Sequence, residues 1–212
     1  MAERAIPHFS YGHPTKDKIL DASIKLFAVN GYDSVTMRDI SEAVGISQGA
    51  IYNHYKSKEE LFEDVMSRFE QKYKCYFDWL INENAKAETL EQVMDNFFAE
   101  LLVVRDLSTY YGISLLTKEH FQNTTARERL FRLIYVDSIN WIQADIDRLM
   151  TKGVIPQSDS KTIASLFMWF VLAGNDMRIY ESTATKLPIN CTEMYSGFKA
   201  FLTAVLRNGI DS

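Results

Sequence analysis

The sequence predicts an all-helical fold with two domains. Only 9 glycines and 4 prolines interrupt the 212 residues, which favours long helices over a turn-rich β fold. No stretch shows the sustained two-residue alternation of a half-buried strand, whereas apolar residues recur at helical spacing between capping residues. Hydrophobic residues make up 47% of the chain, enough for a packed interior. We expect a flexible arm at 1–14, a small N-terminal domain at 15–60 and a larger C-terminal domain at 61–212.

Local signals mark the first two helices. Residues 15–29 place apolar side chains on one face of a helix. Asn30 and Gly31 end it, because glycine accepts the left-handed conformation at a helix C-terminus. Thr36 then caps a second helix, and Asp39, three positions later, completes a capping box.

A tight turn at Gly45 leads to the third helix. Ser47 caps this very short helix, which runs through Tyr52. Ser57 followed by Glu60 repeats the capping pattern and opens a long fourth helix at about 57–81.

The remainder of the chain keeps the helical pattern. A loop is expected at 118–124, and Gly153 with Pro156 ends the helix before them. Either Ser158 or Ser160 opens the helix that follows. We expect the later helices at about 89–104, 109–117, 125–151, 160–180 and 192–206.

Neither composition nor spacing indicates an active site. The formal net charge is -5 and the 15–58 segment is close to neutral, so total charge does not point to nucleic acid. Cys75 and Cys191 lack metal or redox spacing, and we expect reduced thiols, no metal, no cofactor and no catalytic residue. Glu119 is expected in a solvated loop. The histidines, none with a partner at diagnostic spacing, are His8, His13, His54 and His120.

Targeting signals are not evident. The N-terminal residues lack a basic stretch followed by an apolar run. The longest apolar run, 166–174, is far shorter than the roughly 20 residues of a membrane span. We expect a soluble, cytoplasmic protein that does not enter a membrane.

The most informative stretch is 36–55, which has the pattern of a helix-turn-helix. Its apolar positions, such as Ile40 and Ile51, suit packing beneath two short helices, and Gly45 suits the turn. The second helix would present polar groups of the type that reach DNA bases or phosphates. An ordinary helical hairpin is the alternative. The outward positions are Ser47, Gln48, Gly49, Tyr52 and Asn53.

Residues 19–61, ILDASIKLFAVNGYDSVTMRDISEAVGISQGAIYNHYKSKEEL, resemble the N-terminal domain of the TetR family. The resemblance implies that Thr36 and Arg38 contact a phosphate and that Ser47, Gln48 and Gly49 open the recognition helix. Tyr52 and His54 match phosphate-contacting positions, although partial burial or local packing are alternatives. Gln48 is the candidate for base readout, because its amide can pair bidentately with adenine. Lys58 is expected on the DNA backbone, and Tyr55 and Phe62 in the core.

The resemblance also implies a homodimer formed by the last two long helices, so that two recognition helices meet a palindromic operator. Packing of the same faces within one subunit is the alternative. The candidate interface residues are Phe167, Phe170, Val171, Gly174, Phe198, Phe201, Leu202 and Val205.

A pocket for a small apolar or aromatic effector is expected in the C-terminal domain, and plain core is the alternative for each of its residues. The effector would move the fourth helix, and the protein would then leave the operator. Whether the protein represses or activates transcription stays open. The candidate pocket residues are Phe97, Phe98, Tyr110, Tyr111, Phe121, Tyr135, Trp141 and Trp169.

Two other classes of protein compete with this interpretation. An enzyme is disfavoured because no phosphate loop, nucleotide fingerprint or catalytic pairing is present. The second class is a helical interaction module that no longer binds DNA. The near-neutral charge of the N-terminal domain is compatible with this alternative.

Overall fold

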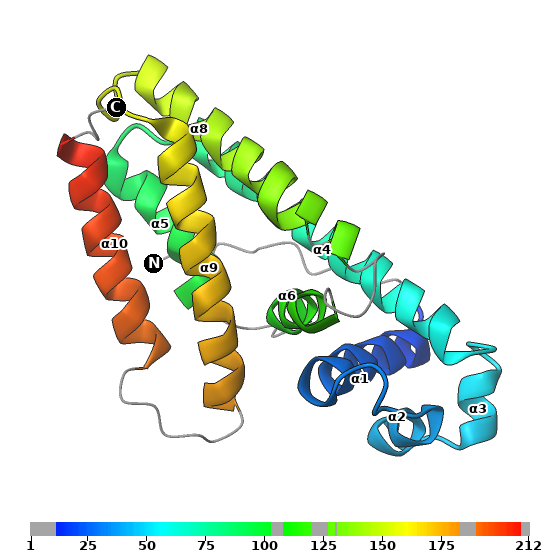
Figure 1. Cartoon of the computed structure of the whole chain (residues 1–212). Coiled ribbons are helices and arrows are strands. Elements are labelled where there is room, and N and C mark those ends of the chain that lie inside the picture. Colours follow the sequence, from blue (N-terminus) through cyan, green and yellow to red (C-terminus); the bar gives the residue numbers. More distant parts are fainter. Residues whose placement is uncertain (1–11, 103–107, 120–126, 130, 183–189, 209–212) are drawn as a thin grey trace. The chain divides into compact units, whose positions relative to one another are not determined.

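The computed structural model describes residues 12–102, 108–119, 127–129, 131–182 and 190–208. Every regular element in these ranges is a helix (Figure 1). This confirms the all-α prediction. Within the same ranges, no helix is long and apolar enough to cross a membrane.

The chain divides into two compact units. The first comprises Met1–Cys75 and Asp106–Leu130, and the second comprises Tyr76–Arg105 and Phe131–Ser212. The sequence-based division at residue 60 differs from this partition, since the first unit also takes in residues 61–75 and 106–130. The chain therefore passes from the first unit to the second after Cys75, returns to the first unit for residues 106–130, and then enters the second unit again.

The first unit is built around the apolar face of its first helix. Ile19, Leu20 and Phe27 are buried, and the N–H of Gly31 closes the helix on the carbonyl of Phe27. The elements are α1 (Pro14–Asn30), α2 (Met37–Val44), α3 (Gln48–Tyr52), the first part of α4 (Lys58–Ala85) and α6 (Ser108–Glu119).

Helix α6 packs closely in this unit. An added Cβ at Gly112 would lie 2.0 Å from Cδ2 of Phe69 on α4, so this position requires a glycine. The helix extends through Glu119, and that side chain is buried with 9% exposure. The loop expected at 118–124 was wrong for Lys118 and Glu119, which belong to α6 where it packs against α1, and Glu119 is buried rather than solvated.

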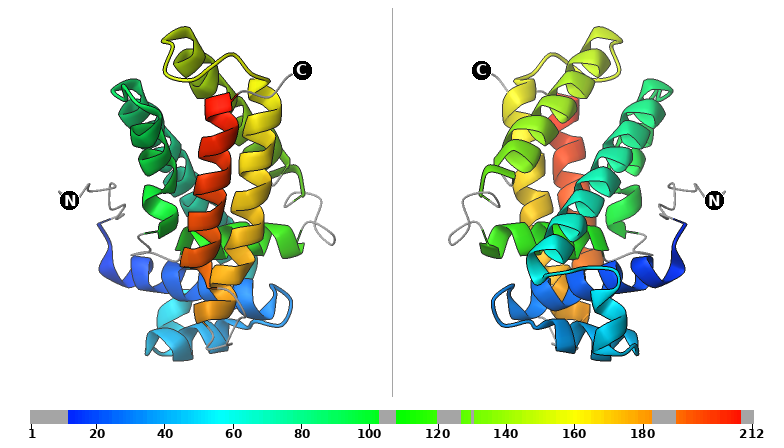
Figure 2. Two further views of the ribbon diagram at one scale, coloured as in Figure 1. Left: turned by 90° about the vertical axis from the view of Figure 1, so that its left-hand side faces the viewer. Right: turned by 90° about the vertical axis from the view of Figure 1, so that its right-hand side faces the viewer.

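The second unit holds the remainder of α4 and the later helices. Figure 2 shows α9 and α10 side by side. Phe97 and Phe98 of α5 contact Phe167 of α9, and Phe98 also contacts Phe198 of α10. The other elements are α5 (Leu90–Leu102), η1 (Phe131–Ser138), α8 (Ile139–Thr151), α9 (Ser160–Ser182) and α10 (Cys191–Asn208).

Two local expectations in this unit need correction. The expected helix at 125–151 is not uniform, because residues 131–138 form a π-helix before the α-helix begins at Ile139. Asp159, rather than Ser158 or Ser160, caps α9, since its carboxylate accepts hydrogen bonds from the N–H and hydroxyl of Thr162.

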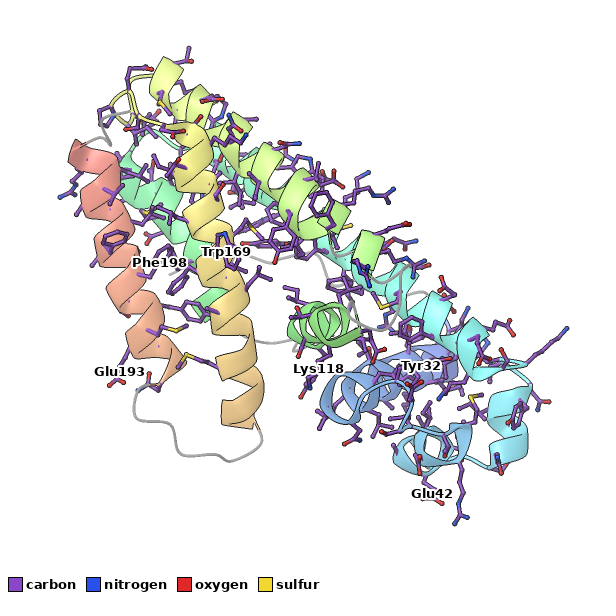
Figure 3. The ribbon with its side chains drawn as sticks, in the orientation of Figure 1. Tyr32, Glu42, Lys118, Trp169, Glu193 and Phe198 are labelled. Carbon is purple, nitrogen blue, oxygen red and sulfur yellow. The ribbon has the colours of Figure 1, made fainter. Side chains whose placement is uncertain are left out.

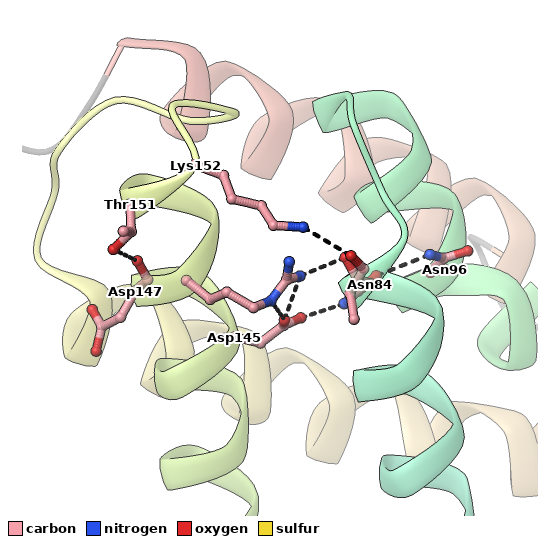
Figure 4. Close-up of polar contacts among 8 residues, drawn as sticks. Asn84, Asn96, Asp145, Asp147, Thr151 and Lys152 are labelled. Atoms are coloured by element: carbon pink, nitrogen blue, oxygen red, sulfur yellow. Dashed lines mark hydrogen bonds and ion pairs between the residues drawn. The ribbon is translucent and has the colours of Figure 1, made fainter.

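A buried polar network joins α4, α5 and α8 (Figure 4). The Asp145 carboxylate accepts hydrogen bonds from the Asn84 amide and the Arg148 guanidinium, and Asn96 donates to Asn84. Arg148 and Lys152 donate to the carbonyls of Asn84 and Ala85 at the end of α4. Two cations therefore satisfy carbonyls that have no partner within the helix.

Candidate nucleic-acid interface

Side-chain caps define both helices of the candidate interface. The Thr36 hydroxyl accepts from Asp39 N–H at 3.2 Å, and the Asp39 carboxylate accepts from Thr36 N–H at 2.8 Å. The predicted capping box is thus present. Hydrogen bonds from the Thr36 backbone, and then from its hydroxyl, hold the pKa of Asp39 below its usual value. Ser47 accepts from Ala50 N–H and opens α3 as predicted.

The turn between these helices depends on Gly45, whose φ of 76° lies in the left-handed region. Beneath the two helices, Ile40 and Ile51 are fully buried. Their burial fixes which side of α3 points outward.

The outward side of α3 carries the predicted DNA-contacting residues. Gln48, Gly49 and Asn53 are exposed, as is Ser47, and Tyr52 is 46% exposed. A Cβ at Gly49 would meet nothing within 4 Å. A ligand can therefore reach the backbone of α3 closely at this point.

Arg38 lies on the exposed face of α2 and forms an ion pair of 2.8 Å with Glu42, which is labelled in Figure 3. Both side chains are largely exposed, so the pair contributes little to stability. A phosphate can replace Glu42 at the guanidinium at small cost. Thr36 is also exposed, beside Arg38.

His54 follows α3 and is half-buried. Its ring meets the His13 ring edge to face, with centroids 5.5 Å apart. Tyr55 is buried and donates to Asp64, and burial followed by that carboxylate raises its pKa well above the ordinary value. Tyr55 and Phe62 are thus core residues, as expected. The sequence offered no signal for the His13 contact, because 41 positions separate the two histidines.

Lys58 is engaged within the protein. Its ammonium donates to the carbonyls of Tyr32 and Val35, both at 3.0 Å, and lies 4.2 Å from the centroid of the Tyr32 ring. Burial, followed by the Glu59 carboxylate, raises the pKa of that tyrosine to about 12. Lys58 therefore holds the connection between α1 and α2, a contact that the sequence analysis missed.

The candidate pocket residues fall into several environments. Phe97 and Phe98 are buried in the second unit, and Tyr111 is buried in the first. The side chains of Tyr110 and Phe121 lie outside the described residues.

Three other candidate pocket residues, all in the second unit, keep some exposure. Trp141 is half-buried against Phe77. Tyr135 lies edge to face with Trp169, which is 61% exposed and is labelled in Figure 3. Tyr135 and Trp169 therefore form an aromatic pair that a ligand can reach.

The candidate dimer residues are also divided. Phe167, Gly174 and Leu202 are buried within the unit, and an added Cβ at Gly174 would lie 2.7 Å from the Tyr195 hydroxyl. Phe201 is 56% exposed on α10. The half-buried candidates are Phe170, Val171, Phe198 and Val205.

Comparison with known sequences identifies the same N-terminal region. Residues 19–65 match the sequence model of "Bacterial regulatory proteins, tetR family". The chain is 31% identical over 128 residues to the biofilm operon icaADBC HTH-type negative transcriptional regulator IcaR of Staphylococcus epidermidis, covering 55% of this chain and 68% of that protein. It is 42% identical over 67 residues to IcaR of Staphylococcus aureus, where the match spans 32% of each chain.

Solved structures share the whole fold at lower identity. Salmonella enterica GusR has a TM-score of 0.63 at 22% identity, covering 93% of this chain and 98% of that one. The fatty acid degradation regulator FadR from Bacillus halodurans has a TM-score of 0.65 at 19% identity, covering 93% and 99%. A transcriptional regulator from Saccharomonospora viridis in complex with choline reaches 0.68 at 19% identity, covering 89% and 95%. With its capped helix-turn-helix, its all-helical fold and its IcaR relative, the chain belongs to the TetR family of DNA-binding transcriptional regulators.

Proposed function

We propose that the protein is a repressor that binds a palindromic operator as a homodimer and is released by a small apolar or aromatic effector. The observation that carries the proposal is the outward face of α3, where Gln48, Gly49, Tyr52 and Asn53 are exposed on a helix anchored by buried Ile51. Repression is supported by the relatives, which are named as negative regulators.

In this proposal the DNA contacts have separate roles. Gln48 reads a base edge, and Gly49 allows close approach of the α3 backbone. Tyr52 and His54 contact phosphates, together with Thr36 and Arg38 at the start of α2. Ser47 and Asn53 supply further hydrogen bonds at the two ends of α3. Because these residues carry little positive charge, we expect a shallow salt dependence and a contribution from DNA shape.

Dimerisation would bring two copies of α3 to one operator, with half-sites spaced by helical turns of DNA. Exposed Phe201, beside half-buried Val205 one turn later on α10, supports an interface on that helix. Phe170 of α9 stacks on Phe198 of α10 with centroids 3.6 Å apart, so both helices contribute to the same surface. Phe167 and Leu202 would support this surface from within one subunit.

An effector site in the second unit is supported by Tyr135 and Trp169, which combine aromatic surface with a phenol able to orient a ligand. The Saccharomonospora viridis regulator, which shares this fold, was solved in complex with choline, and this supports small-molecule binding by a protein of this fold. If effector and operator are linked, each weakens the binding of the other by the same factor.

The experiment is selection of bound duplexes from a random library, followed by affinity measurement against salt. We expect a palindromic consensus and a linear fall of log affinity with log salt concentration. Gln48→Ala should change the selected base at one position per half-site, whereas Glu88→Ala, on an exposed position distant in sequence, is the control. Failure of the wild-type protein to enrich any duplex at low salt would refute the proposal in favour of an interaction module.

The effector is tested separately by a small-molecule screen that follows the tryptophan fluorescence of the protein, with Trp169→Phe to assign the change to this one of the 3 tryptophans. A hit should lower operator affinity, and saturating operator should lower the affinity for the hit by the same factor. Binding of a hit with no mutual effect would refute effector control while leaving DNA recognition intact.

A further inference from the structure

The short connection between α1 and α2 is held from two sides in the first unit. From α4, the Lys58 ammonium binds the carbonyls of Tyr32 and Val35, each at 3.0 Å. From α6, a Glu119 carboxylate oxygen accepts the Tyr32 N–H at 3.0 Å. Both polar backbone groups of Tyr32 therefore have charged side-chain partners, which form strong hydrogen bonds.

The end of α6 also reaches α1. Lys118, labelled with Tyr32 in Figure 3, donates to the carbonyl of Ala28 in the last turn of α1. The last carbonyls of a helix have no partner within it, and a cation there is favourable. The Tyr32 ring packs against Phe27 of α1 and Phe62 of α4, with centroids 5.5 and 4.7 Å away. Three helices thus fix one residue.

Tyr32 lies close to the start of the helix-turn-helix. Only four residues separate Tyr32 from Met37, where α2 begins, and α3 follows after Gly45. A change in the backbone at Tyr32 would act on α2 through this short connection, and on α3 through the turn at Gly45. The buried carboxylate of Glu119 keeps the Tyr32 N–H in one direction.

Glu119, which accepts the Tyr32 N–H, comes from a segment that is flanked in the chain by the second unit. Helix α6 lies in a segment, Asp106–Leu130, that enters the first unit from the second and returns to it. The segment also holds α4, because Arg129 pairs with Glu63 at 2.6 Å and with Glu70 at 3.3 Å. Glu119 is thus supplied by an element whose chain continues on both sides into the unit proposed to bind the effector.

We propose that Glu119 is a positioning residue for operator binding, which sets the direction of α2 and α3 through the Tyr32 N–H without touching DNA. The inference rests on the proposed function and adds α6 as a control point of the helix-turn-helix. Lys58 acts on the same connection from α4.

The test compares Glu119→Ala and Glu119→Gln in the full-length protein, with operator affinity measured by fluorescence anisotropy. Glu119→Ala leaves the Tyr32 N–H without its acceptor, and we expect operator affinity to fall about tenfold. Glu119→Gln keeps an amide oxygen as acceptor and should recover most of that loss. Glu128→Ala, on an exposed position of the same segment, is the matched control and should bind as the wild type does.

Two further readouts separate positioning from general stability. The salt slope of operator binding should be unchanged in Glu119→Ala, because no phosphate contact is lost. Hydrogen exchange should accelerate at residues 32–36 more than in α1. Should Glu119→Ala not fold, Glu119→Asp, which withdraws the acceptor by one methylene, takes its place.

Wild-type affinity in Glu119→Ala or Glu119→Asp would overturn the inference, as would a glutamine variant as weak as the alanine variant. A changed salt slope would instead assign Glu119 an effect on the DNA contacts themselves and would also overturn it. If the wild-type protein binds no duplex, the proposed function fails, whereas a binding wild type with unaffected variants refutes only the role of Glu119.

Discussion

Adding one methyl group at Gly49 should change stability and DNA binding in opposite directions. A Cβ at this position meets nothing within 4 Å, and the residue lies on an exposed face inside the first turn of α3. Alanine exceeds glycine in helix stability by up to about 1 kcal/mol, and less near a helix end. We therefore expect Gly49→Ala to gain roughly 0.5 kcal/mol, a rise in melting temperature of about 1–2 °C.

The same methyl would occupy the space through which the α3 backbone approaches DNA. We expect this methyl group to cost about 1 kcal/mol of binding free energy per half-site, which is the lower end of the range for a disturbed base contact. A dimer carries the change twice, so the total is about 2 kcal/mol, or roughly thirtyfold in affinity.

The assay pairs thermal unfolding with operator titration at one salt concentration, and a scrambled duplex is the control. Affinity for the scrambled duplex should change much less, because non-specific binding depends on phosphates. Unchanged or tighter operator binding by the more stable variant would refute the assignment of Gly49 to the interface.

Further substitutions test other parts of the structure. Gly112→Ala would place a Cβ 2.0 Å from the Phe69 ring, and the overpacking cost of about 1–3 kcal/mol should exceed the helix-propensity gain of about 1 kcal/mol, so chemical denaturation should show lower stability. A more stable variant would contradict the packing of α6. Phe201→Glu should weaken the proposed dimer by at least about a hundredfold, measured by sedimentation equilibrium, since it would bury a carboxylate in the proposed interface. An unchanged dimer would remove Phe201 from the interface. The pKa of Asp39 is lowered by its hydrogen bonds from Thr36, so its capping contribution is complete above its unfolded pKa of about 3.9 and is lost as the pH falls through the lower folded value. Unfolding measured between about pH 2 and pH 5 should lose part of its pH dependence in Asp39→Asn, and identical profiles would exclude this carboxylate as a source of acid sensitivity.

The local chemistry of the N-terminal helices could be predicted from sequence. Thr36 with Asp39, and Ser47 with Ala50, interact across three residues, and Gly45 satisfies a single left-handed position. Such signals are complete within one turn of chain. They therefore define the two helices and the turn between them, whereas the burial of Ile40 and Ile51 decides which side of α3 faces outward.

Apolar periodicity did not reveal how each face is covered. Phe167 and Phe201 belong to similar stripes, yet one is buried in its own unit and the other is exposed. Among the pocket candidates, Phe97 and Phe98 are buried, whereas Trp169 is exposed. Helical spacing predicts that a face is apolar, but the neighbouring helices decide whether a subunit, a partner or a ligand meets it.

The sequence by itself determined the all-helical fold, the capped helix-turn-helix and the family, because these depend on short-range caps, turns and periodicity. Only the tertiary structure decided the contacts of Lys58 with Tyr32, of Glu119 with Tyr32, and of Asp145 with Asn84. Those partners lie 26, 87 and 61 positions apart. No local pattern encodes such pairs, because they arise only when packed helices bring a buried charge to a backbone or side-chain group that needs a partner.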